Sequence, residues 1–246
     1  MVDIHTHLLF GVDDGPKTLE ESIEMIREGM KLGFKEFYLT SHYNKKEYYN
    51  EDYEKNYEIL KKKCEDLKLK VKLHRGNEVY LDENTTRVLS EKKFNTIGKE
   101  FLLVEFSPLT TTLVGRKLLK KVLNEGFVPI LAHVERYNLF RGRDLIQLRK
   151  LGVKLQVNIT GEKPKHIVKL LENGHIDFLG SDAHGVEKRG YVWSEELKYI
   201  NKMTTFNGVT KEDKGHEKRQ FTNGNFSSFF RSIFSGIRAR RDSKKS

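Results

Sequence analysis

Apolar residues along the first 180 positions occur in short blocks that alternate between the spacing of strands and the spacing of helices. Short apolar or alternating runs predict strands, and apolar residues three or four positions apart predict helices. The predicted strands are Val2–His7, Phe37–Thr40, Val71–Glu78, Phe101–Glu105, Val128–Ala132, Leu155–Asn158 and Ile176–Gly180. The predicted helices are one that begins at Thr18 and ends at Gly33, and then Tyr53–Leu67, Leu113–Asn124, Arg143–Lys150 and Pro164–Glu172.

Local signals support this alternation of elements. Thr18 and Glu21 have the spacing of a capping box, and Pro164 suits the first turn of the last helix. The apolar run in Phe101–Glu105 is typical of a strand buried on both faces. Strands separated by helices favour a parallel α/β barrel or a doubly wound sheet.

Composition adds limits on the class of protein. The chain has 246 residues and a mass of 28.8 kDa, with 37% hydrophobic and 33% charged residues, which suits one large domain and disfavours disorder. No apolar run approaches about 18 residues, so we expect no transmembrane span. The start lacks the regions of a signal peptide, and the single cysteine, Cys64, suits a reducing cytosol. We therefore expect a cytoplasmic protein.

The net charge of +10 is concentrated near the C-terminus. Residues 201–246 contain eleven basic and four acidic residues, a net charge of +7, whereas the first 200 residues carry 34 basic and 31 acidic groups. A nearly balanced body lacks the charge of a general nucleic-acid-binding protein, so we expect no nucleic-acid partner.

The predicted strands end in, or run into, residues that bind metals. In His5-Thr-His7, alternation along the strand places both imidazoles on one face. The carboxyl ends of the strands of a parallel barrel meet at one rim, where barrel enzymes have their active sites. The candidate metal ligands at these positions are His5, His7, Asp14, His42, Glu78, Glu105, His133, Asp182 and His184.

Each of these residues also has a simpler explanation on its own. A single histidine is commonly structural, the run Asp13-Asp14-Gly15 can form only a turn, and Glu105 can be an exposed strand end. Together they form a set of imidazole and carboxylate ligands without thiolate, which suits Zn²⁺, Mn²⁺ or Fe²⁺. Nine ligands exceed those of a single catalytic zinc and indicate a cluster of two or three metal ions.

Two arginines follow closely after candidate ligands. Arg136 lies three residues after His133, and Arg189 lies five after His184. Either alone can be an ordinary surface residue, but a guanidinium fork matches the oxygens of a phosphate. Metals beside arginines predict hydrolysis of a phosphate ester, in which the metals turn a bridging water into hydroxide and stabilise charge on the transferred group.

Other hydrolytic mechanisms lack their sequence signals. A cysteine-dependent phosphatase carries its thiolate in a phosphate-binding loop, whereas Cys64 falls inside a predicted amphipathic helix. The sequence contains neither a Gly-x-x-x-x-Gly-Lys-Ser/Thr nucleotide loop nor a Gly-x-Ser-x-Gly nucleophile elbow. The sequence thus favours a metal-based mechanism.

Seven motifs, in order along the chain, resemble a known family. They are Asp3-Ile-His5-Thr-His7, Asp13-Asp14-Gly15-Pro16, Thr40-Ser41-His42, Gly76-Asn77-Glu78-Val79-Tyr80, Glu105-Phe106-Ser107, Ala132-His133-Val134-Glu135-Arg136-Tyr137 and Gly180-Ser181-Asp182-Ala183-His184. They resemble the polymerase and histidinol phosphatase (PHP) superfamily and, within it, the bacterial manganese-dependent protein-tyrosine phosphatases of capsule and exopolysaccharide loci. The Asp-Asp-Gly-Pro loop and the His-x-Glu-Arg-Tyr run distinguish this branch, and the resemblance covers about residues 1–200.

The resemblance implies a distorted (β/α)7 barrel, similar to a TIM barrel, with three divalent metal ions. Mn²⁺ is the first choice, and Fe²⁺, Zn²⁺ and Mg²⁺ are alternatives. One metal would be held by His5, His7, Glu78 and Asp182, a second by Glu78, Glu105 and His133, and a third by Asp14, His42 and His184. Arg136 and Arg189 would grip the phosphate, with Asp14 as a further catalytic residue. The implied substrate is phosphotyrosine on a membrane-bound tyrosine kinase that controls polysaccharide synthesis.

Two regions depart from the family pattern. The segment after Asn158 is shorter than usual and passes from Thr160-Gly161 to Lys163-Pro164, which would remodel one wall of the cleft. After about Tyr199 the family's final helices are not recognisable. We therefore divide the chain into a barrel, residues 1–200, and a divergent basic tail, residues 201–246.

The tail has two predicted parts. Residues 203–225 are polar and contain Gly, and so predict a flexible linker. Residues 226–241 predict a helix with one apolar face. The apolar positions of that face are Phe226, Phe229, Phe230, Ile233, Phe234 and Ile237. Either this helix packs on the barrel or a neighbouring subunit, or its arginines and apolar face bind an anionic membrane surface.

The leading functional hypothesis is a metal-dependent protein-tyrosine phosphatase in the cytoplasm, at the inner membrane surface if the tail binds there. Within enzymes, the alternatives are a small-molecule phosphoesterase, such as a histidinol-phosphate phosphatase, and a nuclease. A different class is a non-catalytic metal-binding module whose tail binds a partner.

Overall fold

A computed structural model describes residues 1–46, 48, 50–161, 163–187 and 189–191. Its strands are β1 (Val2–Thr6), β2 (Glu36–Leu39), β3 (His42–Tyr43), β4 (Lys72–Arg75), β5 (Glu78–Tyr80), β6 (Phe101–Glu105), β7 (Val128–Leu131), β8 (Lys154–Asn158) and β9 (Phe178–Gly180). Its helices are α1 (Leu19–Lys31), α2 (Tyr53–Asp66), α3 (Thr85–Glu91), α4 (Thr112–Asn124), α5 (Gly142–Lys150) and α6 (Lys165–Glu172), with short 3-10 helices η1 (Asn50–Asp52) and η2 (Val134–Arg136). The predicted linker 203–225 and tail helix 226–241 lie outside the described residues.

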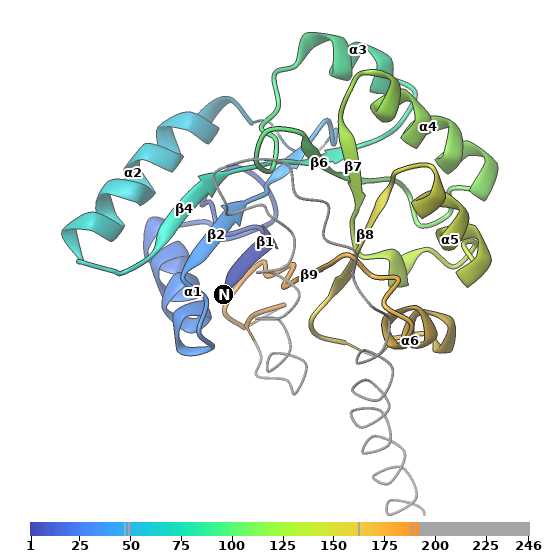
Figure 1. The fold of residues 1–246 in the computed structure, drawn as a ribbon. Helices are drawn as coiled ribbons and strands as arrows, with labels where there is room; N and C mark the ends of the chain where they lie inside the picture. The colour runs from blue at the N-terminus through green and yellow to red at the C-terminus, as the bar shows by residue number, and fades with distance from the viewer. Residues whose placement is uncertain (47, 49, 162, 188, 192–246) are drawn as a thin grey trace, which may run out of the picture.

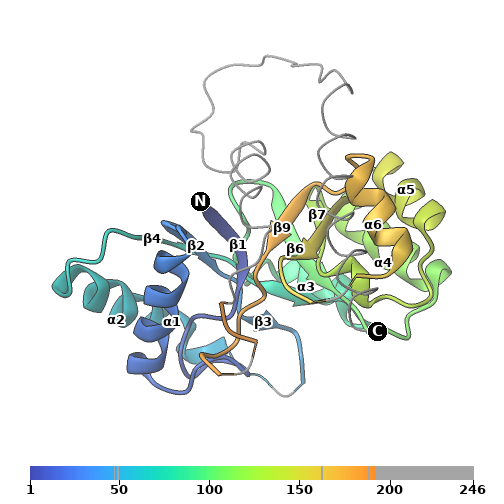
Figure 2. The ribbon, with the colours of Figure 1, turned by 90° about the horizontal axis from the view of Figure 1, so that it is seen from below.

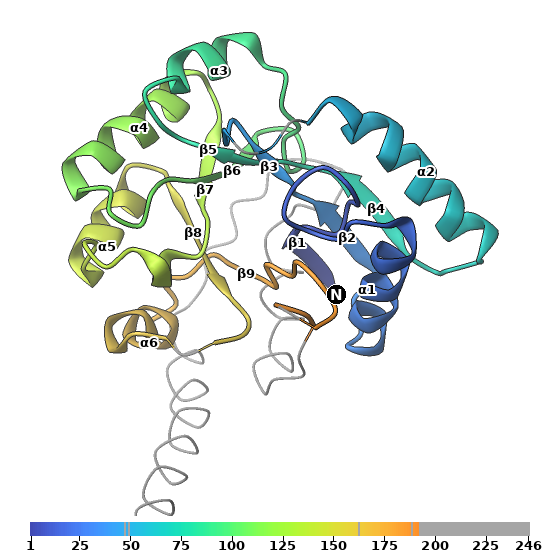
Figure 3. The ribbon, with the colours of Figure 1, turned by 180° about the vertical axis from the view of Figure 1, so that it is seen from behind.

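The strands form a curled, all-parallel ring in two hydrogen-bonded parts, of order β1-β2-β4 and β3-β5-β6-β7-β8-β9. The parts are joined because β3 follows β2 along the chain and β5 follows β4. Next to β1, the backbone N–H of His7 donates to the Ala183 carbonyl (2.9 Å) and that of Asp182 to the His5 carbonyl (2.8 Å). The helices lie outside the strands (Figures 1 and 3), and β1 lies beside β9 (Figure 2). The prediction of a distorted parallel barrel is confirmed.

The prediction of one continuous strand over Val71–Glu78 is wrong. The chain breaks between β4 and β5 at Gly76, opposite a matching break between β2 and β3. The buried Tyr53 hydroxyl fills the gap: it donates to the Leu39 carbonyl (2.7 Å) and accepts from the Gly76 N–H (3.1 Å). A Cβ on Gly76 would come within 2.9 Å of Thr40 Cγ2, so this close approach requires glycine. Strand pairing resumes after the break, where His42 of β3 lies directly opposite Glu78 of β5.

The observed helix ends can be compared with the capping and turn signals in the sequence. The predicted capping box is present, because Thr18 Oγ1 accepts from the Glu21 N–H (3.2 Å) and Glu21 Oε2 accepts from the Thr18 N–H (3.3 Å). Pro164 is the N-cap of α6 rather than part of its first turn. Helix α3 was not predicted, although the Asp82 carboxylate, which accepts from the Asn84 N–H (2.8 Å), gives its start a turn signal.

The apolar core of the barrel borders the polar ends of the strands. A large cluster of buried side chains includes residues of all six α-helices, and a smaller one contains Leu103, Ile130 and Phe178 from β6, β7 and β9. Leu103 lies two residues before Glu105 on the same strand and hence on the same face, so an apolar layer lies next to the polar strand ends. Within the described part of the chain, no helix combines the length and hydropathy of a membrane span.

Candidate metal centre

All nine predicted ligand residues lie in one cluster at the carboxyl ends of the strands. Their potential ligand atoms form three overlapping groups in which all atoms lie within 4.8 Å of one another. The groups are His7, Asp14, His42 and His184; His5, His7 and Asp182; and His42, Glu78 and Glu105. His133 joins them through its Nε2 atom, 2.9 Å from Glu78 Oε1.

Four of these side chains form an inner group: His5, His7, Glu78 and Asp182. His5 Nε2 lies 3.4 Å from both Glu78 Oε1 and Asp182 Oδ1, and His7 Nε2 lies 3.4 Å from Glu78 Oε2. The alternation expected for β1 therefore does bring the two imidazoles together, with their Nε2 atoms 3.4 Å apart. At most 2% of any of these four side chains is exposed.

His42 faces two groups at once, one with each ring nitrogen. Its Nδ1 lies 3.1 Å from both Glu78 Oε2 and Glu105 Oε1. Its Nε2 lies 3.4 Å from Asp14 Oδ1. His133 Nε2 lies 3.6 Å from Glu105 Oε2, so both histidines point at the carboxylates of the second implied metal position. The resemblance assigned only His133 to that position.

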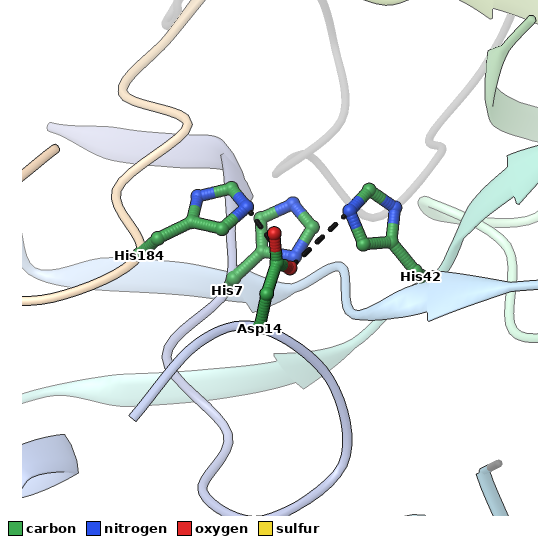
Figure 4. A group of neighbouring side chains, drawn as sticks. All are labelled: His7, Asp14, His42 and His184. Carbon is green, nitrogen blue, oxygen red and sulfur yellow. Dashed lines mark ion pairs between the residues drawn. The ribbon is translucent and has the colours of Figure 1, made fainter. Parts of the chain in front are cut away.

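Asp14 lies at the mouth of the cluster, between His42 of β3 and His184 of the segment after β9. Figure 4 shows its carboxylate facing His42 and His184, whose Nε2 atoms each lie 3.4 Å from Asp14 Oδ1. The ring of His7 stacks on that of His184, with centroids 3.8 Å apart. The Asp14 side chain is 37% exposed, so this group faces incoming molecules more openly than the inner group.

Asp13 and Gln156 hold these ligands in place, and sequence reasoning assigned neither of them this role. Asp13 Oδ2 lies 2.7 Å from His7 Nδ1 and accepts from the His42 N–H (3.0 Å). Gln156 Oε1 lies 3.1 Å from His5 Nδ1 and accepts from the His133 N–H (2.7 Å). Such partners fix the orientation of metal-binding imidazoles. The Asp13-Asp14 pair was a usable signal for Asp13, whereas nothing local in the sequence distinguishes Gln156.

The electrostatics of the cluster favour bound cations. Burial lowers the pKa of His5, but the Glu78 and Asp182 carboxylates outweigh it and raise this pKa to about 9. Burial opposes ionisation of Glu78 and Asp182, yet the surrounding histidines hold the pKa of both carboxyls below the ordinary range. Among the described residues, the buried atoms Glu78 Oε2, Asp182 Oδ1 and His184 Nε2 accept or donate no hydrogen bond. Buried, unpaired imidazole and carboxylate atoms that converge in this way fit divalent metal ions.

Three residues of the site adopt left-handed backbone conformations without being glycine. The φ angles are 31° at His133, 55° at Asp182 and 55° at Arg189. Such conformations cost free energy, of order 1–3 kcal/mol each, and cluster at functional sites. The loops after β7 and β9 are therefore strained at the residues that face the cluster.

The two predicted arginines meet at one carboxylate oxygen. Arg136 Nη2 and Arg189 Nη2 both donate to Asp182 Oδ2, the second at 2.7 Å. Their side chains are 39% and 43% exposed, so each is half inside the site and half open to solvent. Two guanidinium groups side by side at the edge of this cluster have the charge and the fork geometry that suit an anion.

Lys45 is a third cation at the cluster, which sequence reasoning missed. Its Nζ donates to Glu105 Oε1 at 3.1 Å and lies 3.3 Å from His42 Nε2. Burial lowers the pKa of its ammonium, but Glu105 and the nearby Glu78 and Asp14 carboxylates outweigh this and raise it, so the side chain is a cation. In the sequence, Lys45 is one of two consecutive lysines in a charged loop and carries no distinguishing signal.

Cys64 takes no part in the cluster. It is buried in α2 among apolar side chains, and burial raises the pKa of its thiol to about 11. This agrees with the expectation that the chain does not use a cysteine nucleophile.

Comparisons with known proteins agree with this geometry. A family model described as capsular polysaccharide synthesis, CpsB/CapC, matches residues 1–211. The tyrosine-protein phosphatase CpsB of Streptococcus agalactiae is 31% identical over 217 residues, which cover 81% of this chain and 89% of that protein. The tyrosine-protein phosphatase CpsB of Streptococcus pneumoniae is 30% identical over 210 residues, which cover 77% of this chain and 85% of that protein. A solved chain from the structures of YwqE of Bacillus subtilis and CpsB of S. pneumoniae, described as metal-dependent tyrosine phosphatases, aligns with a TM-score of 0.72 and 26% identity over 84% of this chain and 88% of that one. With its ordered motifs, its barrel and this match, the chain belongs to the CpsB/CapC family.

Proposed function

We propose that this chain is a metal-dependent protein-tyrosine phosphatase. The observation that carries the proposal is the cluster of nine His, Asp and Glu side chains with Arg136 and Arg189 at its edge. Relatives named tyrosine-protein phosphatase cover most of this chain, which supports the same chemistry here.

The donor set fits three divalent metal ions, and we assign Mn²⁺ as the first choice. His5, His7, Glu78 and Asp182 would hold one ion, Glu78, Glu105 and His133 a second, and Asp14, His42 and His184 a third. When bound, such ions make water a nucleophile and neutralise the charge of a phosphoryl group. The 3.1 Å approach of His42 Nδ1 to Glu105 makes His42 a competing ligand for the second ion.

The protein's own side chains then orient the substrate. Arg136 and Arg189 bind the non-bridging oxygens of the phosphate, in exchange for their contacts with Asp182. Asp13 keeps His7 in the tautomer whose Nε2 faces the metal position. The His184 and His42 imidazoles, whose Nε2 atoms each lie 3.4 Å from Asp14 Oδ1, hold the pKa of Asp14 low against burial, so its partly exposed carboxylate accepts a hydrogen bond from water that enters the site.

The substrate class is tested by comparing phosphoesters side by side. The purified full chain, supplied with Mn²⁺, is assayed on a phosphotyrosine peptide, a phosphoserine peptide, histidinol phosphate and single-stranded DNA, with and without chelator. We expect the fastest chelator-sensitive turnover on phosphotyrosine. Faster turnover of histidinol phosphate or DNA would favour the corresponding alternative, and full metal occupancy without turnover would favour a non-catalytic module.

We further propose a cytoplasmic enzyme that acts on a membrane-bound tyrosine kinase. The basic tail, residues 201–246, would bring it to the anionic inner surface of the membrane through the apolar residues of 226–241. Flotation with anionic liposomes compares the full chain with a Phe230→Glu, Phe234→Glu variant. We expect the variant to bind less, and equal partitioning would contradict the proposal.

A further inference from the structure

Lys45 is held against the ligand cluster by a segment that follows β3 directly. Its Nζ donates to Glu105 Oε1 at 3.1 Å, and its side chain is only 29% exposed. The ring of Tyr48, from the same loop, stacks on His42 with centroids 5.4 Å apart and an interplanar angle of 8°. Lys45 Nζ lies 5.9 Å from the centre of the Tyr48 ring. One loop therefore places a cation and an aromatic ring beside the same metal ligand.

The contacts of Lys45 and of the arginines are divided between two carboxylates. Arg136 and Arg189 both donate to Asp182, which belongs to the inner group, whereas Lys45 donates to Glu105. Glu78 links the two carboxylates through histidines, since it lies 3.4 Å from His5 and 3.1 Å from His42. A phosphate bound over the cluster therefore has guanidinium groups on its Asp182 side and an ammonium on its Glu105 side.

We infer that Lys45 is a further catalytic residue, which stabilises the leaving phenolic oxygen when the phosphate ester of tyrosine is cleaved. This inference rests on the proposed phosphatase function. In the reaction, the oxygen of water forms a bond to phosphorus and the bond from phosphorus to the phenolic oxygen breaks. The attacking water gives up one proton to solvent. The electron pair of the broken bond stays on the phenolic oxygen, which takes up one proton from solvent, and inorganic phosphate is released. The Lys45 ammonium donates a hydrogen bond to this oxygen as negative charge develops there, and it keeps its own proton.

The chemistry of the side chain fits this role better than a guanidinium would. An ammonium is a compact point charge with three donors, so it can keep its bond to Glu105 and still donate to one further oxygen. The two arginines have the fork geometry that suits a pair of non-bridging oxygens. The Tyr48 ring offers an aromatic neighbour for the leaving tyrosine ring.

The test measures how hydrolysis depends on the acidity of the leaving group. The full-length metal-loaded protein is compared with Lys45→Met, Lys45→Arg and, as a matched control, Lys46→Met, which changes an exposed lysine next in sequence. The substrates run from p-nitrophenyl phosphate, whose leaving group needs little help, through phenyl phosphate to a phosphotyrosine peptide. Metal content is measured for every variant, because a loss of metal would reduce all rates together.

For Lys45→Met we expect kcat on the phosphotyrosine peptide to fall by about 10²–10³-fold, the size found when one transition-state donor is removed. The loss on p-nitrophenyl phosphate should be less than about tenfold, so the rate depends more steeply on the leaving group. Lys45→Arg should recover part of the rate, and Lys46→Met should match the unaltered protein. Metal content should not change.

Two outcomes for the Lys45→Met variant would overturn the inference. An equal loss across all substrates would mean that Lys45 only positions Glu105, and no loss would mean that it has no part in the reaction. If the unaltered protein cleaves none of the aryl phosphates while fully loaded with metal, the proposed function fails and this role fails with it. Activity of the unaltered protein together with an unchanged leaving-group dependence in Lys45→Met contradicts the role of Lys45 alone.

Discussion

The inner group and the side chains at the mouth of the site differ in how they are held. We call Asp14, Lys45, Arg136 and Arg189 the outer group. The inner side chains, at most 2% exposed, come from strands or lie within two residues of a strand end, and the outer side chains, 29–43% exposed, come from loops and from the short helix η2. His5 is fixed through its backbone and through its ring, because its carbonyl accepts from the Asp182 N–H and its Nδ1 faces Gln156 Oε1.

This difference separates two tasks. A rigid, buried set of ligands fixes the positions of ions, whereas half-exposed charged side chains can exchange a protein contact for a substrate contact. Arg136 and Arg189 both rest on Asp182, a contact that an incoming phosphate can replace. Changes to the inner group should therefore remove metal and activity together, and changes to the outer cations Lys45, Arg136 and Arg189 should reduce activity while metal stays bound.

The largest effect is expected for Glu78→Gln. Glu78 faces His5, His42 and His133, so loss of its negative charge weakens two metal positions at once. We expect a loss of activity of at least about 10³-fold, since one transition-state contact alone is worth about 10²–10³. Elemental analysis should show reduced metal content. Glu83→Gln, at an exposed loop position, is the control. Full metal content in Glu78→Gln would contradict the proposal that the inner group holds the metal ions.

Arg136→Met tests the outer group. Its guanidinium would make charged hydrogen bonds to the phosphate, each worth about 1.5–3 kcal/mol, which corresponds to a loss of about 10–150-fold in kcat/KM. Metal content should equal that of the unaltered protein. Arg143→Met removes an exposed arginine in α5 as the matched control. A variant that loses metal as well as activity would place Arg136 with the inner group.

Asp13→Asn tests whether the hydrogen-bond partners of the predicted metal ligands affect metal binding. Asp13 Oδ2 lies within hydrogen-bond distance of His7 Nδ1 and accepts a hydrogen bond from the His42 N–H. Loss of such a partner of a metal ligand costs about 10–100-fold in metal affinity or activity. Titration with Mn²⁺ should therefore need more metal to reach half-maximal activity. Saturating metal should recover most of the rate. Asp66→Asn, at the exposed end of α2, should behave like the unaltered protein.

The smallest effect is expected at Cys64, which lies in neither group. Cys64→Ala should keep full activity, because the thiol is buried in α2 within the apolar core. Burial raises the thiol pKa from 9.0 to about 11, so at pH 8 the reactive thiolate is about 100-fold rarer than for an ordinary thiol. Its reaction with a thiol reagent should remain slow at pH 8 and accelerate only as the pH rises toward 11. Rapid reaction at pH 8, or loss of activity in the alanine variant, would contradict the structure.

The inner group was largely predictable from sequence, and the outer group only in part. Strand alternation predicts that His5 and His7 share a face, and the common rim of parallel strands predicts that Glu78 and Asp182 join them. The breaks beside Tyr53 were not predictable, because a hydroxyl from α2 replaces strand pairing between segments far apart in sequence. Lys45 was not predicted as a site residue for a similar reason. Its contact with Glu105 joins residues 60 positions apart and depends on where β3 begins after the break.

The central claim is that a buried metal cluster performs phosphotyrosine hydrolysis, and one titration tests it most directly. Metal-free protein is titrated with Mn²⁺ while bound metal and turnover of a phosphotyrosine peptide are measured on the same samples. We predict that activity rises together with bound metal to three ions per chain, is abolished by chelator and returns when Mn²⁺ is restored. Turnover that persists in chelator, or fully loaded protein that leaves the peptide intact, would contradict the account.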